Sequence, residues 1–295
     1  MTSSQRTSTL CGVVLLALAG WLASFAAAQD PSGPSPQVPG IRVVTANVRY
    51  GTARDGVHAW PLRRELALGV LADARPDVLG LQEALRFQVE EVRARFPHHV
   101  VIGEGRDGGD RGEWTALLVD GRRFTVRAAG TFRLAPKDEL GAVGWDAALT
   151  RIATWAELSD REDGGRVVRV INAHFDHIGQ QARLESARLI GRFAAGRGEL
   201  PTVVLGDFNA GEQSAPLKAL AEAGLRDTFR DAHPDDLPVG TGHGFRGGRA
   251  GAKIDHVLVD DRLETTEAWI DWTEAEGRFP SDHRFVGAVM RRRVD

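Results

Sequence analysis

Cysteine is almost absent from this 295-residue chain. The sequence contains one, Cys11, within an apolar stretch near the N-terminus. A single cysteine excludes an intramolecular disulfide framework, so the folded chain must be stabilised by its hydrophobic core. With 42% hydrophobic residues, the sequence is long enough to bury one such core. It shows no solenoid-type repeat, and beyond the N-terminal stretch it has no apolar run of membrane-spanning length. One folded domain is therefore the simplest organisation.

An excess of basic residues is also missing. The 37 Lys and Arg residues are outnumbered by 40 Asp and Glu residues, which gives a formal net charge of -3. This balance provides no global positive field that would hold a long nucleic acid by releasing its counterions. A local basic groove is a separate hypothesis, and its candidate residues are Arg106, Arg111, Arg246, Arg249 and Lys253. The alternative is that these side chains only solvate loops.

The N-terminal segment is typical of an export signal. Arg6 precedes the apolar stretch from Leu10 to Ala28, and the small residues at its end precede Gln29. This pattern predicts a secretory signal peptide over residues 1–28 and a secreted or periplasmic location. An uncleaved anchor that tethers the chain to a membrane is the alternative, because the stretch approaches spanning length. Residues 29–40 are rich in Pro, Ser and Gly and are predicted to be a flexible linker to a catalytic domain at residues 41–295.

Helical and strand periodicities alternate in the first part of this domain and give way to hairpins later. Apolar residues at helical spacing predict helices over residues 60–74, 85–96, 183–193 and 216–223. Runs typical of strands cover residues 113–118, 125–132, 152–158 and 167–174, and residues 160–165 are expected to form a hairpin turn. The Gly-rich and charged segments 106–111 and 231–252 are expected to be loops.

Polar side chains follow several short apolar runs at the point where each run ends. The positions that follow such a run are Asn47, Gln82-Glu83, Asn172 to His177 and Asp207 to Asn209. Asp255 lies inside a further apolar stretch, and Asp282-His283 come before one. Asp207 and Asn209 are two residues apart and would share one face of extended backbone, although each is also a common turn residue. Strand ends are where sites gather in layered α/β folds. None of these clusters supplies a Ser or Cys nucleophile in an elbow motif, so we expect direct attack by water with the help of a hard cation.

The ordered set of motifs resembles the endonuclease/exonuclease/phosphatase superfamily, the DNase I-like proteins. The motifs are Thr45-Ala46-Asn47, Leu81-Gln82-Glu83, Gly112-Glu113, Asn172-Ala173-His174, Gly206-Asp207-Phe208-Asn209, Ile254-Asp255-His256 and Ser281-Asp282-His283. The stretch from Gly144 to Arg151 and the later Arg183 resemble a bacterial branch similar to nocturnin-like enzymes, although Ala173 stands where that branch often has Thr. The resemblance implies a four-layer α/β sandwich, in which two packed sheets of mixed or antiparallel strands are flanked by helices.

The resemblance also implies a role for each motif residue. Asn47, Glu83 and Asp282 would bind Mg²⁺ or Mn²⁺, whose preferred ligands are oxygen atoms. Asp207 and Asn209 would orient the attacking water and the phosphate. His283 would act as the general base or contact the phosphate, with its tautomer fixed by Asp255. Glu113 would orient His174, which would donate a hydrogen bond to a nonbridging oxygen. Whether Asp207 or His283 takes the proton of the water stays open.

Six further residues are candidates for substrate binding, and each has a structural alternative. Arg151 and Arg183 would contact a phosphate, or they are surface charges. Asp176 and His177 would join a second metal position, or they shape the pocket and the loop of His174. Trp145 and Phe245 would be aromatic walls, or they are packing residues. His256 points to the opposite face of its strand from Asp255 and is predicted to be structural.

The expected function is therefore that of a secreted Mg²⁺-dependent phosphoesterase, which hydrolyses a phosphomonoester or phosphodiester without a protein partner, as a monomer. The alternatives are an extracellular nuclease, a sphingomyelinase-like lipid phosphodiesterase, and a noncatalytic phosphate-binding module. The last would be indicated by loss of Glu83, Asp207, Asp255 or His283, and all four residues are present.

Overall fold

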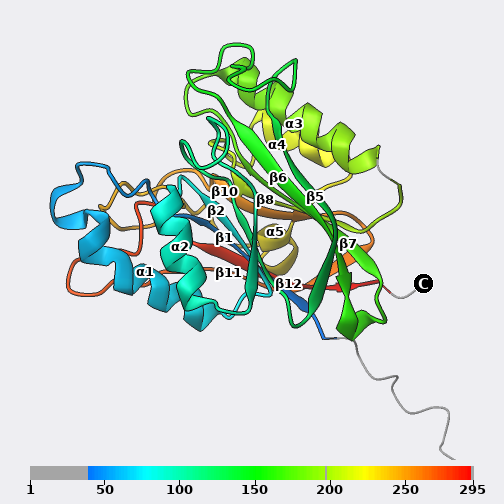
Figure 1. The fold of residues 1–295 in the computed structure, drawn as a ribbon, viewed down its shortest axis with the longest axis horizontal. Coiled ribbons are helices and arrows are strands. Elements are labelled where there is room, and N and C mark those ends of the chain that lie inside the picture. The colour runs from blue at the N-terminus through cyan, green and yellow to red at the C-terminus, as the bar shows by residue number, and fades with distance from the viewer. Residues whose placement is uncertain (1–38, 197, 294–295) are drawn as a thin grey trace, which may run out of the picture. The chain divides into compact units, whose positions relative to one another are not determined.

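Two six-stranded β-sheets form the centre of the structure, a computed structural model that describes residues 39–196 and 198–293. Helices cover the outer faces of the sheets (Figure 1). The four-layer sandwich expected from the sequence is thus confirmed. The predicted signal peptide and most of the predicted linker lie outside the described residues. Within the described part of the chain, no helix is long and apolar enough to span a membrane.

The first sheet carries helices α1 (Trp60–Ala74) and α2 (Arg86–Arg95) on its outer face. In spatial order, its strands are β11 (Leu263–Ile270), β12 (Val286–Arg292), β1 (Ile41–Asn47), β2 (Val78–Gln82), β4 (Leu117–Asp120) and β3 (His99–Ile102). Strands β1 and β2 are parallel, whereas the other neighbouring pairs are antiparallel. A short 3-10 helix, η1 (Gly56–His58), precedes α1.

The second sheet carries α3 (Gln180–Ala195) and α4 (Ala215–Glu222) on its outer face. Its strands, in order, are β5 (Phe124–Arg133), β6 (Ile152–Asp160), β7 (Val167–His174), β8 (Thr202–Asp207), β10 (Asp255–Val259) and β9 (Arg226–Asp227). Strands β7 and β8 are the parallel pair. The 3-10 helix η2 (Arg161–Asp163) lies in the β6–β7 turn, and α5 (Thr228–Ala232) follows β9.

The layering follows from the two-residue alternation of strand side chains. Val43 of β1 and Val203 of β8 belong to the same cluster of buried residues between the sheets, where both are fully buried. The next residues along, Val44 and Val204, pack outward against the helices of their own sheet. Strands that are buried on both faces read as continuous apolar runs, which is why these runs lack the alternation of a half-exposed strand.

Most predicted elements are confirmed with boundaries that differ by a few residues, and the start of one strand, β4, was wrong. The helix at 60–74 and the strand at 167–174 have the predicted bounds, and the turn at 160–165 is present. The third helix begins three residues earlier than predicted, at Gln180. The strand predicted at 113–118 begins only at Leu117, because the residues before it make isolated bridges through Trp114 rather than a ladder. The loop predicted at 231–252 loses its first two residues to α5.

A buried polar link joins the two sheets close to the strand ends that carry the predicted site. Asn172 of β7 accepts a hydrogen bond from Gln82 Nε2 of β2 at 2.7 Å. Its own Nδ2 donates to the carbonyl oxygens of Leu81 and Ala116 at 2.9 and 2.8 Å. Because Asn172 and Gln82 are fully buried, these bonds cannot be replaced by water without opening the core.

Candidate active site

Strand register places three of the predicted residues next to one another in the second sheet. His174 of β7 pairs with Asp207 of β8, and Asp207 pairs with Asp255 of β10. Gly206 allows this close approach, because it adopts φ 148° and a Cβ there would lie 1.9 Å from the carbonyl oxygen of Ala173. His174 Nε2 lies 3.5 Å from Asp207 Oδ2 as a result.

The first sheet contributes Asn47 at the end of β1 and Glu83 directly after β2. Asn47 Nδ2 lies 3.0 Å from Glu83 Oε1 and 2.9 Å from Asp207 Oδ2, so one amide bridges the two sheets. Glu83 adopts φ 59°, a left-handed conformation that is uncommon for residues other than glycine. Strained backbone of this kind is often found at functional sites. The side chains predicted from two separate motifs therefore meet at one point.

His283 enters from the loop before β12 and contacts Asp255, as the sequence predicts. Its Nδ1 lies 2.9 and 3.2 Å from the two carboxylate oxygens of Asp255 and 3.9 Å from Asp207 Oδ2. Burial disfavours the imidazolium, but the carboxylates of Asp255 and Asp207 outweigh it and raise the pKa of His283 well above its usual value. Burial and the nearby Asp255 charge raise the pKa of Asp207. The centre therefore favours a positively charged His283 at neutral pH.

Oxygen atoms suited to a hard cation gather around Asn47. Asp282, next to His283, has a raised pKa because it is buried and because the charge of Glu83 lies nearby. Carboxylates crowded in this way gain from a bound cation, and the predicted set Asn47, Glu83 and Asp282 supplies the oxygen ligands that Mg²⁺ or Mn²⁺ prefers. Asp207, Asp255 and His283 also place possible ligand atoms within 4.8 Å of one another. The oxygen-rich set fits a hard cation better because its donor atoms are all oxygens, and to bind the cation Asn47 Oδ1 would exchange the hydrogen bond that it accepts from the Arg49 backbone N–H at 2.9 Å.

Arg49 is a residue of this region that the sequence analysis missed. Its guanidinium donates to Asp55 from Nε and Nη2, at 3.2 Å each. Nη1 lies 3.9 Å from Glu83 Oε2, and Nε lies 3.8 Å from Asp282 Oδ2. The side chain is 29% exposed, so it reaches the mouth of the site. Its place two residues after Asn47, just past the end of β1, was the available signal, and the left-handed backbone of Arg49 (φ 56°) turns the chain at this point.

The expected pairing of Glu113 with His174 was wrong. Glu113 instead forms an ion pair with Arg106 at 2.9 Å. His174 lies against Arg151, whose Nη1 is 3.1 Å from both ring nitrogens, and the Nδ2 of Asn209 is 3.4 Å from its Nε2. Burial and the Arg151 charge lower the pKa of His174 well below its usual value, so this imidazole is neutral at neutral pH.

Arg151 is buried and connects three of the predicted residues rather than facing solvent. It contacts Asp176 at 3.4 Å, His174, and His177 Nδ1 at 2.9 Å. Asp176 Oδ1 also accepts hydrogen bonds from the backbone of Ile178 and Gly179. Although burial opposes it, these bonds lower the pKa of Asp176 to about 2. This arrangement favours the pocket-shaping role of Asp176 over that of a second metal ligand.

The remaining candidate residues are partly exposed. Arg183 donates to the carbonyl oxygen of Asp176 at 2.9 Å and lines a pocket together with Asn209. Phe245 stacks on His58 with ring centroids 4.6 Å apart, in agreement with a packing role. Trp145 is partly exposed with φ 52°, and its substrate contact stays a prediction.

A buried ion cluster removes Lys253 from the predicted basic groove. Lys253 Nζ lies 2.6 Å from Asp227, which also lies 2.7 Å from His256 Nδ1. His256 Nε2 is 3.0 Å from the carbonyl oxygen of Ala210, so its predicted structural role is supported by its contacts. Because the Lys253 side chain is fully buried, it cannot contribute to an open basic groove, and the charge of Arg106 is balanced by Glu113.

Two sheets that bring carboxylates, an amide and histidines together at their strand ends define a hydrolase-type centre on a DNase I-like fold. The Endonuclease/Exonuclease/phosphatase family model matches residues 44–283, and the chain belongs to this family. Its members include phosphoesterases and nucleases, which supports a hydrolase. No curated protein matched the sequence.

Solved structures agree with this assignment. An endonuclease/exonuclease/phosphatase from Bacteroides vulgatus is 32% identical, with a TM-score of 0.80 over 86% of this chain and 99% of that one. A mannosyl-6-phosphatase from Bacteroides thetaiotaomicron is 29% identical, with a TM-score of 0.76 over 85% and 99%. The human Nocturnin catalytic domain is 18% identical, with a TM-score of 0.69 over 87% and 95%, and this likeness concerns the fold alone.

Proposed function

We propose that the chain is an exported Mg²⁺-dependent phosphoesterase that hydrolyses a compact phosphomonoester by in-line attack of water, as a monomer. One observation carries this proposal. Asn47 links Glu83 of the first sheet to Asp207 of the second, beside the His283–Asp255 pair. The arrangement combines hard oxygen ligands with a polarised imidazole and offers no covalent nucleophile in an elbow motif.

The protein side chains divide the chemistry between them. A divalent cation bound by Asn47, Glu83 and Asp282 would neutralise phosphoryl charge and polarise the phosphoryl group. His283, held cationic by Asp255, would donate a hydrogen bond to the phosphoryl oxygens as charge builds there. Asp207 lies within the same cluster, and its raised pKa suits a carboxylate that accepts a proton from the attacking water near neutral pH.

His174 and Asn209 would complete the oxygen-binding side. His174 is neutral, so one ring nitrogen can donate while the other accepts, and Arg151 supplies positive charge behind it. The Asn209 amide faces the same imidazole. Together these groups would orient the phosphate while the proton moves between water and Asp207.

A monoester of a small polar alcohol is the preferred substrate for two reasons. The similar structure from Bacteroides thetaiotaomicron is described as a mannosyl-6-phosphatase, and it aligns over nearly all of its length. The net charge of -3 and the burial of Lys253 also disfavour an extended polyanion. Export through the predicted signal peptide would place this activity outside the cytoplasm.

The proposal is tested by phosphate release from a panel of sugar phosphates, nucleotides, nucleic acids and phospholipids. We expect turnover of sugar phosphates with Mg²⁺ or Mn²⁺, and its loss with EDTA or in Asp207→Ala. Asp261→Ala is the matched control, because Asp261 is an exposed acid outside the site. Undiminished turnover under chelation would sink the metal requirement, and undiminished turnover of Asp207→Ala would remove this residue from the mechanism.

A further inference from the structure

A pocket opens directly beside the catalytic cluster, between the start of α3 and the segment that follows β8. Its volume is about 510 Å³, within the range of small-molecule sites. Asn209 lines it, and the same amide lies 3.4 Å from His174 Nε2. If a phosphate binds at the cluster, a group esterified to it could therefore extend into this pocket.

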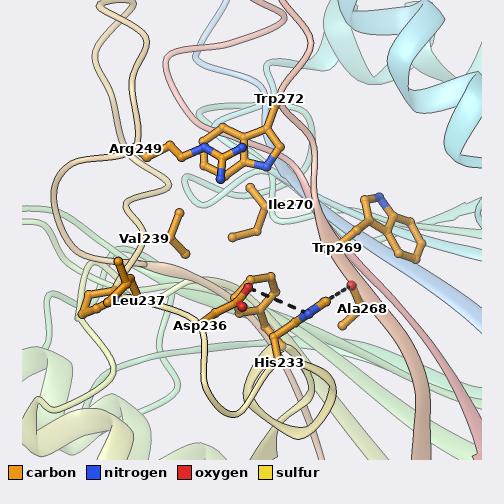
Figure 2. A pocket seen from close by; sticks show the side chains of 11 residues that line it. His233, Asp236, Leu237, Val239, Arg249, Ala268, Trp269, Ile270 and Trp272 are labelled. Atoms are coloured by element: carbon orange, nitrogen blue, oxygen red, sulfur yellow. Dashed lines mark hydrogen bonds and ion pairs between the residues drawn. The ribbon is translucent and has the colours of Figure 1, made fainter.

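Four other pockets in the described residues lack this connection. The pocket in Figure 2 is larger, about 600 Å³, and Arg249 lies over Trp272 at its wall, with Ile270 and Val239 nearby. No residue of the catalytic cluster lines it. Nothing in the structure indicates what would occupy that apolar surface, whereas the pocket at Asn209 is tied to the proposed chemistry.

An unpaired hydroxyl lies in the wall of the pocket at Asn209. Ser214 occupies the N-cap position of α4, where a serine usually accepts a bond from the backbone of the helix's first turn. It makes no such bond here, and Pro216, two residues on, has no N–H to offer. Ser214 Oγ is buried without a hydrogen-bond partner among the described residues. Because this oxygen has almost no exposed surface, a ligand hydroxyl pairs with it only when the wall of the pocket shifts, and that pairing would remove the cost of an unpaired polar atom.

The rest of the lining is also suited to hydroxyl groups. Gln180 and Gln181 bring amides from the first turn of α3, and Arg183 is held at the wall by its bond to the carbonyl oxygen of Asp176. Amide and guanidinium groups donate and accept the bonds that sugar hydroxyls make. The apolar part of the lining comes from aliphatic residues, namely Leu184, Ala210, Ala215 and Pro216, and it contains no aromatic ring on which a nucleobase would stack.

We propose that this pocket binds the alcohol half of the substrate, and that this half is polyhydroxylated, as in a sugar phosphate. The inference rests on the proposed phosphoesterase function, because it assigns the group that leaves when the phosphoester bond is cleaved. Ser214 and Gln181 become specificity-determining residues, since they would contact the alcohol and not the phosphorus. Nucleotide bases would find no aromatic ring to stack on in the same lining.

The test compares kcat/KM for mannose 6-phosphate and glucose 6-phosphate with kcat/KM for p-nitrophenyl phosphate, whose leaving group has no other hydroxyl. In Ser214→Ala and Gln181→Ala, we expect the ratio of sugar phosphate to p-nitrophenyl phosphate to fall about tenfold, the effect of one lost hydrogen bond to a substrate hydroxyl. Gln213→Ala is the matched control, because Gln213 is exposed and does not line this pocket. A third variant, Ala215→Phe, narrows the pocket and should lower the same ratio further.

The outcomes separate this inference from the proposed function. A ratio that is unchanged in all three pocket variants, or that falls equally in Gln213→Ala, overturns the inference. A wild-type protein that prefers nucleotides or phospholipids to sugar phosphates overturns it as well. If the wild type hydrolyses no phosphoester at all, the proposed function itself has failed. Thermal melting of each variant shows that a change in ratio does not come from unfolding.

Discussion

The contact between Asp255 and His283 makes the sharpest prediction about catalysis. Asp255→Asn keeps the size of the side chain and replaces a carboxylate by an amide, 2.9 Å from His283 Nδ1. The variant removes the nearest negative charge that stabilises the imidazolium. It also allows the ring to adopt a different tautomer, because an amide can donate as well as accept. We expect His283 to be charged less often and oriented less well.

The size of the effect follows from the geometry. Two unit charges about 4 Å apart interact by about 4 kcal/mol at the effective dielectric constant of about 20 that suits protein sites. Loss of that stabilisation in the transition state corresponds to a decrease of about 10³-fold in kcat. Asp207 and Asp282 remain near His283 and offset part of the loss. The expected decrease is therefore about 10²- to 10³-fold.

The pH profile distinguishes this explanation from a loss of folding. Because the folded protein raises the pKa of His283, the charged form is present at neutral pH and is lost as pH rises through the raised value. The alkaline limb of kcat should therefore move to lower pH in Asp255→Asn. The measurement is kcat for p-nitrophenyl phosphate with Mg²⁺ between pH 5 and pH 10, a range spanning the usual histidine and higher values, with Asp261→Asn as control. A folded variant with kcat within about threefold of wild type, less than 1 kcal/mol, would refute the reasoning.

Three further predictions concern the support of the site. Asn172→Ala leaves its buried hydrogen-bond partners unpaired and should lower the free energy of unfolding by about 3 kcal/mol and Tm by about 6–10 °C, measured by urea and thermal melts. Arg49→Gln removes a partly exposed cation of the site and should weaken inhibition by inorganic phosphate about tenfold. Arg54→Gln, which changes an exposed neighbour, is the control and should leave the inhibition constant unchanged. Equal inhibition constants for Arg49→Gln and the wild type would contradict this prediction. Asp176→Asn should lower stability at pH 7 by about 2 kcal/mol, and the difference should vanish as pH falls from about 4 to about 2, because the lowered pKa stabilises the fold only above that window. A difference that persists at pH 2 would assign the effect to packing.

The layers of the fold could be predicted well, because apolar runs and helical spacing are local properties of the chain. The helix Trp60–Ala74 and the strand Val167–His174 have the predicted bounds for this reason. Strand β4 was misplaced at its start, because Trp114 makes isolated bridges to Ala84 and Gly105, which are distant in the sequence. The strand propensity of residues 113–116 could not show that Trp114 would bridge to these distant partners instead of continuing the regular ladder of β4.

The partners of charged side chains were harder to predict than their positions. Asp255 and His283 are 28 residues apart and were paired correctly through the family motifs. Glu113 was assigned to His174, but Arg106 lies closer along the same loop and offers a full charge. Arg49 was overlooked because it stands outside the motif ending at Asn47, although the backbone turn aims it at Glu83 and Asp282.

The sequence alone determined which residue types stand at the strand ends, and hence the oxygen-rich chemistry of the site. Asp207, Asn209, Asp255 and His283 are fixed by the order of the chain, and so are the apolar runs that carry them to the edge of a sheet. Only the tertiary structure decided the protonation state of each histidine. Burial and the charge of Arg151 lower the pKa of His174 and keep it neutral, whereas Asp255 and Asp207 raise the pKa of His283 against the effect of burial and keep it charged. The physical reason is that electrostatic interactions depend on distance and burial, and two sheets must pack before either quantity exists.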